Sequence, residues 1–170
     1  MLLLLKQFFN ICLLSKGPQD LPWSHLLLHF TLVAYLMTGV LSMLAITPLE
    51  QALPVMLVDA GVLLLYTWLC LQAFNKAARF IQMAAALAGV GAIFQIAEWP
   101  LMLYIDSQQS QLPPAIAMIS LMLLVWNLVV YAHIFRESFN IRLLSAYVLT
   151  LTYVVISASA KQLFFPDAGV

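Results

Sequence analysis

The feature that most constrains the fold is a series of five apolar segments, each long enough to cross a lipid bilayer. They cover about residues 25–46, 54–74, 80–105, 114–135 and 143–164. A helix needs about 20 apolar residues to span the hydrocarbon core of a bilayer. Barrel strands are shorter and alternate apolar with polar residues, and these segments do not. The sequence therefore predicts an all-α, polytopic membrane protein with a bundle of five transmembrane helices in residues 25–170.

The composition agrees with this class. Of the 170 residues, 64% are hydrophobic and 8% are charged, against about 25% charged in soluble domains. Seven basic and seven acidic residues cancel, too few to neutralise a series of phosphates, so no nucleic-acid partner is expected. The expected partners are membrane lipids and other membrane proteins or further copies of this chain. Cys12 and Cys70 lack metal-ligand spacing and are predicted to be structural thiols.

The distribution of basic residues predicts the orientation. Six of the seven precede the first span or join the second to the third and the fourth to the fifth: Lys6, Lys16, Lys76, Arg79, Arg136 and Arg142. The positive-inside rule makes that side cytoplasmic. An odd number of spans then gives a cytoplasmic N-terminus and a periplasmic C-terminus in a bacterial inner membrane, with Lys161 alone on the outer side.

Residues 1–24 precede the first span and are predicted to form an interfacial amphipathic helix followed by a membrane-entry turn. Their apolar run is too short to span a bilayer, and Lys6 interrupts it. On a helix, Lys6, Gln7 and Asn10 would share one face. In "SKGPQDLPWS" the glycine and prolines end that helix, and Asp20 or Ser24 is expected to cap the next one.

Two further patterns bear on the helices. Small residues recur at four-residue spacing in the third span, at Ala84, Ala88 and Ala92, which predicts close packing at the centre of the bundle. Most prolines are predicted to lie at helix ends, where a missing N–H costs little: Pro48, Pro54, Pro113, Pro114 and Pro166. Pro100 is the exception, and it is expected to end or kink the third span.

The chain carries no strong catalytic motif, so no catalytic residues are predicted and the protein is not expected to be an enzyme. Polar residues inside spans are costly in lipid and are the default site candidates. Asp59 and Glu98 lie in the outer halves of the second and third spans, with Gln95 one turn deeper. They suggest a proton or cation site, or else contacts with interfacial water, and no basic residue is expected at their depth. Asn127 is expected to form an interhelical hydrogen bond.

Three histidines raise a second possibility. His25 and His29 lie one turn apart at the inner end of the first span, and His133 lies at a comparable depth in the fourth. Paired histidines from two helices are the minimum for haem ligation, and three could hold a metal ion. The alternative is contact with lipid headgroups or nearby carbonyls, and we predict no cofactor and no metal.

The chain resembles a Yip1-type integral membrane domain, and also small proteobacterial inner-membrane proteins related to it. The resemblance lies in "KGPQDLPWS" before the first span, "KAARFIQMAAALAGVGAIFQ" entering the third and "WNLVVYAHIFRE" leaving the fourth. It implies a five-span fold and a non-enzymatic role, because Yip1-type proteins act by binding other proteins.

We therefore expect a non-enzymatic inner-membrane protein, a scaffold or accessory subunit of a membrane assembly. One alternative is a small transporter or proton-linked permease that uses Asp59 and Glu98. The second alternative is a haem- or metal-binding electron-transfer subunit that uses His29 and His133.

Overall fold

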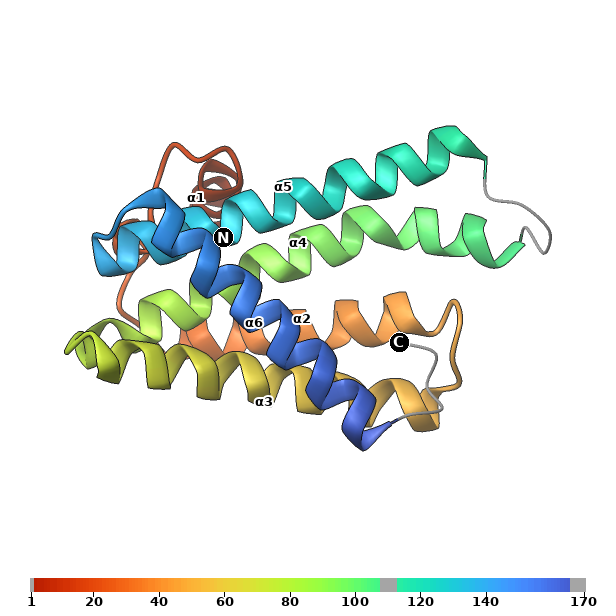
Figure 1. Ribbon diagram of the computed structural model, residues 1–170, viewed down its shortest axis with the longest axis horizontal. Helices are drawn as coiled ribbons and strands as arrows, with labels where there is room; N and C mark the ends of the chain where they lie inside the picture. Colours follow the sequence, from red (N-terminus) through yellow and green to blue (C-terminus); the bar gives the residue numbers. More distant parts are fainter. Residues whose placement is uncertain (1, 108–112, 166–170) are drawn as a thin grey trace.

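The structure is a computed structural model that describes residues 2–107 and 113–165, and within those ranges the chain is helical between short connections (Figure 1). The helices are α1 Leu2–Cys12, α2 His25–Met43, α3 Leu49–Ala73, α4 Phe80–Ser107, α5 Pro114–Phe139 and α6 Leu143–Phe164. Two single 3₁₀ turns, η1 Pro18–Asp20 and η2 Ala77–Arg79, precede α2 and α4.

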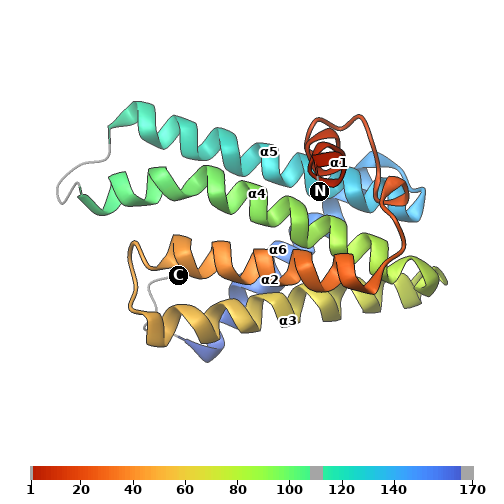
Figure 2. The same cartoon turned by 180° about the vertical axis from the view of Figure 1, so that it is seen from behind.

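In the described part of the chain, helices α2 to α6 are long and apolar enough to cross a membrane. This confirms the predicted all-α bundle of a multi-pass membrane protein. We call the end where α1 lies the N-terminal end, and the opposite end, where α2 connects to α3, the distal end (Figures 1 and 2). Helices α2, α4 and α6 run toward the distal end, and α3 and α5 run back.

Helix α4 lies at the centre of the bundle, as its small residues predict. Two thirds of its span (67%) is buried, against 17–39% for the other four spans. Ala84, Ala85 and Ala88 are fully buried, and α2 packs along this helix more extensively than any other pair of helices packs. Small side chains permit this approach because they let two helix backbones come close together.

The helix ends differ from the prediction at several points. Helix α3 begins at Leu49 rather than at residue 54, so Pro54 lies inside it, and the prediction that Pro54 marks a helix end is wrong. Pro54 lies in the second turn of α3 and costs the helix a single hydrogen bond, the one that an N–H there would donate to the carbonyl of Glu50. Helix α4 continues past Pro100 to Ser107. Helix α5 extends to Phe139 and stops at Asn140, whose φ of 54° is left-handed. Pro166 lies outside the described residues.

Helix α1 runs across the bundle and is seen almost end-on in Figure 2. It packs on α4 and α5 and buries Phe8, Ile11 and Cys12 there. The ring of Phe8 lies so close to Gly89 that a Cβ at this position would collide with it. The amphipathic helix is thus a docked part of the bundle, and its placement on a membrane leaflet stays a prediction.

The connection after α1 makes polar contacts with the same two helices, α4 and α5. His133 Nε2 lies 2.9 Å from the carbonyl oxygen of Lys16, and Gln82 donates to the carbonyl of Leu21 at 2.7 Å. Ser24 caps α2 by accepting from the N–H of Leu27, which is one of the two predicted caps. Asp20 instead accepts from the N–H of Gly17 within the turn.

Candidate functional site

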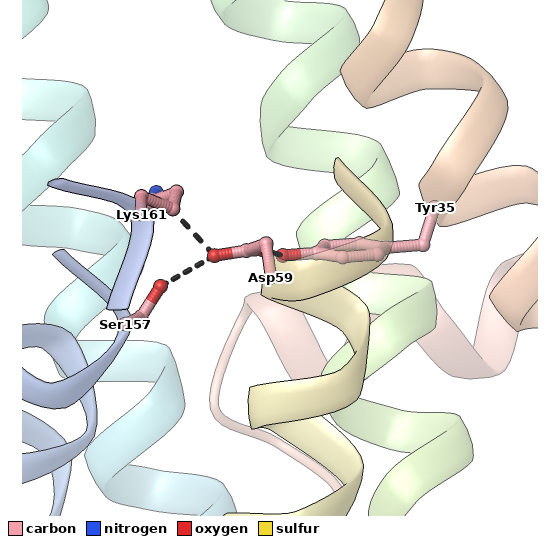
Figure 3. A network of polar contacts seen from close by, with 4 residues as sticks. All are labelled: Tyr35, Asp59, Ser157 and Lys161. Atoms are coloured by element: carbon pink, nitrogen blue, oxygen red, sulfur yellow. Dashed lines mark hydrogen bonds and ion pairs between the residues drawn. The ribbon is translucent and has the colours of Figure 1, made fainter. Parts of the chain in front are cut away.

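Asp59 is the centre of a buried polar network that joins three spans (Figure 3). Asp59 lies on α3, and the residue is 5% exposed. Tyr35 of α2 donates its hydroxyl to Oδ2, and Ser157 of α6 donates to Oδ1. Lys161 of α6 completes the network, with its Nζ 3.3 Å from Oδ1. A charged group inside a membrane protein needs this kind of pairing to offset its lost hydration.

The backbone places these groups at one level. Asp59 is ten residues beyond Leu49, the start of α3, which is about 15 Å along the helix axis. It lies in the first half of α3, the half that connects to α2, as the prediction put it. Ser157 and Lys161 are one turn apart and project from the same face of α6. Figure 1 shows that α6 crosses the bundle obliquely, and this course brings its distal part onto α3.

The prediction that no basic residue would lie at the depth of the two carboxylates is wrong. Lys161 lies near the end of the last apolar segment, so the sequence placed it among the outer connections. Its side chain reaches inward instead, and it is only 24% exposed. The available signal was the pair Ser157 and Lys161 at helical spacing in an otherwise apolar span.

The network forms one wall of a partly open cavity of about 390 Å³. All five spans contribute to its lining. The four polar residues that the sequence singled out, Asp59, Gln95, Glu98 and Asn127, all line it. The fold thus brings together side chains from α3, α4 and α5 that are distant in sequence.

The other polar residues of the cavity differ in how their hydrogen-bonding capacity is used. Gln95 accepts a hydrogen bond from the hydroxyl of Thr38 at 2.6 Å through its Oε1. Glu98 is half-buried. Among the side chains that the structure describes, Glu98 and Asn127 make no hydrogen bond or ion pair. These two groups remain able to bind a solute.

Three tyrosines line the side of the cavity that faces the N-terminal end. Tyr35, Tyr131 and Tyr153 line it, and each is at least 93% buried. The rings of Tyr131 and Tyr153 have centroids 5.9 Å apart, and Tyr66 packs 5.7 Å from Tyr153 on the far side. The hydroxyl of Tyr131 donates to the carbonyl of Leu87 at 3.3 Å. On α2, α5 and α6, the three lining tyrosines are the cavity residues nearest to the N-terminal end of the bundle.

The histidines are placed elsewhere. His25 and His29 are exposed on α2, and the Nδ1 of His29 lies 2.7 Å from the carbonyl oxygen of His25. His133 faces the connection after α1. Among the described residues, no three His, Cys, Asp or Glu side chains are grouped as metal ligands. Haem or metal binding through His29 and His133 is the second alternative, and the separate placement of these histidines gives it no support.

The chain matches no protein-family model, and no curated protein or solved structure matches it significantly. The Yip1-type resemblance stays a prediction.

Proposed function

We propose that the protein is a small transporter that binds a polar solute in the cavity between its five spans. The observation that carries this proposal is that cavity itself, where Glu98, Asn127 and the Asp59–Lys161 pair face one space in an otherwise apolar bundle. Polar groups at this depth are expensive and usually mark a solute or ion pathway. The cavity volume is also within the usual range for small-molecule sites.

The proposed orientation puts the cavity in the outer half of a bacterial inner membrane. It rests on the positive-inside rule, which assigns the N-terminal end of the bundle to the cytoplasm. In this orientation the cavity faces the periplasm, and the layer of Tyr35, Tyr131 and Tyr153 blocks passage toward the cytoplasm. The structure would then correspond to an outward-facing state.

The ion pair gives the solute a way to act on the helices. Lys161 and Ser157 hold α6 to α3 through Asp59, and Tyr35 adds α2 to the same carboxylate. A solute that competes for any of these partners weakens the contact between α6 and the rest of the bundle. Binding and a change in helix packing are then coupled, as carriage requires.

The alternative role as a scaffold receives less support. Small residues on a helix could also receive a helix of a partner protein, but Ala84, Ala85 and Ala88 are fully buried within the chain's own bundle. We propose a non-enzymatic role, because the polar groups of the cavity can bind a solute and the sequence carries no strong catalytic motif.

The test is solute uptake into proteoliposomes from a bacterial metabolite extract, followed by mass spectrometry. Ala158 lines the cavity, whereas its neighbour Ser159 is exposed and does not line it, so Ala158→Trp should fill the cavity and Ser159→Trp should not. We expect at least one solute to accumulate with the wild type and with Ser159→Trp, and to be lost with Ala158→Trp. Equal uptake by the two variants, or no uptake above protein-free vesicles, would contradict the proposal.

A further inference from the structure

We infer that the solute is a small organic amine with an apolar body, and that Glu98 is the counter-ion for its ammonium group. This inference rests on the proposed function and specifies its substrate class. It follows from the charges of the residues that line the cavity, from the apolar side chains beside them, and from the unused hydrogen-bonding capacity of Glu98.

The charges in the cavity leave one carboxylate, that of Glu98, without a positively charged partner. Among the side chains that the structure describes, the charged ones that line the cavity are Asp59, Glu98 and Lys161. Asp59 and Lys161 form an ion pair, and the two oxygens of Asp59 also accept from Tyr35 and Ser157. Glu98 has no such partner among the described residues. A partly buried carboxylate in a membrane helix favours a cation that restores neutrality and replaces lost hydration.

The walls favour a solute with an apolar body. Much of the lining consists of apolar side chains, namely those of Met43, Met56, Met102, Phe94 and Val154. Methionines adapt to the shape of a bound group because they are unbranched and polarizable. The rings of Tyr131 and Tyr153 border the same space, and an ammonium group gains further from aromatic rings nearby.

The same geometry disfavours the other charge classes. An anionic solute would have to take Lys161 from Asp59 and would leave two carboxylates without a cation. A bare divalent ion prefers several oxygen ligands, and within the described part of the chain no three ligating side chains are grouped. A neutral solute could enter, but Glu98 would stay unpaired beside it.

The experiment compares three probes that share one body and differ in the head group: phenethylamine, phenethyl alcohol and hydrocinnamate. Binding to the purified full-length protein is measured by calorimetry, with protein-free detergent micelles as the blank. The variants are Glu98→Gln and, as a control, Glu50→Gln. Glu50 is exposed in the first turn of α3 and does not line the cavity.

We expect phenethylamine to bind to the wild type and to Glu50→Gln, and to bind at least about tenfold more weakly to Glu98→Gln, as the loss of a charged partner requires. The alcohol and the carboxylate should bind at least about tenfold more weakly than the amine to the wild type. Equal binding of the three probes, no binding of the amine, or unchanged binding to Glu98→Gln would overturn the inference. Uptake from the metabolite extract that Ala158→Trp blocks would still support the transporter in each of those cases.

Discussion

The Nζ of Lys161 lies 3.3 Å from Oδ1 of Asp59 and so joins the last span to the second. The two residues differ in their access to water, since the side chain of Lys161 is 24% exposed and that of Asp59 is 7% exposed. Removing either partner leaves the other without its counter-charge, and the cost depends on how well the remaining charge can reach water.

This difference predicts unequal effects of two substitutions. Lys161→Met leaves a buried carboxylate without its cation and should lower the free energy of unfolding by about 3 kcal/mol. Asp59→Asn leaves a lysine that can extend to water and should cost about 1 kcal/mol. The double variant should be more stable than Lys161→Met alone. The measurement is denaturant-induced unfolding in detergent micelles.

Additive losses in the double variant would show that the two residues do not stabilise each other. A larger loss for Asp59→Asn than for Lys161→Met would contradict the assignment of Asp59 as the more buried charge.

Two helix glycines provide a test of packing around the cavity. A Cβ on Gly91 would lie 2.6 Å from Cε2 of Tyr35 and 2.8 Å from the hydroxyl oxygen of Tyr131, whereas a Cβ on Gly61 meets nothing within 4 Å. Gly91→Ala should therefore destabilise the protein by about 1–3 kcal/mol. Gly61→Ala should be neutral or stabilise it by up to about 1 kcal/mol, because alanine is the better helix former.

Thermal unfolding of both glycine variants in the same detergent measures this difference. If Gly91→Ala proves as stable as Gly61→Ala, the two tyrosine rings do not pack against α4 as described.

The docking of α1 predicts slow alkylation of Cys12. Burial raises the pKa of the Cys12 thiol to about 11, so at pH 8 only about one thiol in a thousand is the reactive thiolate. Because the pKa is raised, reactivity should increase about tenfold per pH unit between pH 8 and pH 10. Maleimide labelling in a Cys70→Ala background measures the rate at this single remaining thiol.

Phe8→Ala should accelerate that labelling, because Phe8 packs α1 against Gly89 of α4. Rapid labelling of Cys12 at pH 8 in the chain with Phe8 intact would mean that α1 is not docked on the bundle.

The fold could be predicted from the sequence because length and apolarity decide whether a helix spans a membrane. The small residues of α4 identified the central helix, because small side chains let two helix backbones approach closely. The boundaries of α3 and α5 could not be predicted as well. Pro54 is tolerated one turn inside a helix, and Asn140 stops α5 by a left-handed conformation that no sequence pattern required.

Only part of the candidate site could be predicted from the sequence. Asp59, Glu98, Gln95 and Asn127 stand out as polar residues in apolar spans, and the structure places them around one cavity. Lys161 was missed because its role depends on the oblique course of α6, a property of the assembled bundle.

The proposed orientation predicts the outcome of reporter fusions. Alkaline phosphatase fused after residue 165 should be active, because it folds in the periplasm, and a fluorescent protein at the same site should be dark. Fusions after Asn75, in the connection between α3 and α4, should give the opposite result. If the fluorescent protein fused after residue 165 is bright, that end lies in the cytoplasm and the proposed orientation is wrong.

If the protein is a transporter, its cavity must hold water and admit a charged solute while the protein is in a membrane. Val154 lines the cavity and its neighbour Val155 does not, although Val155 is 62% exposed and Val154 is 40% exposed. The direct test is labelling of Val154→Cys and Val155→Cys by a membrane-impermeant trimethylammonium thiosulfonate, in proteoliposomes and in a Cys12→Ala/Cys70→Ala background. We expect labelling of Val154→Cys and protection of Val155→Cys by lipid. Labelling of Val155→Cys alone, or of neither variant, would show that the cavity does not admit a cation from water.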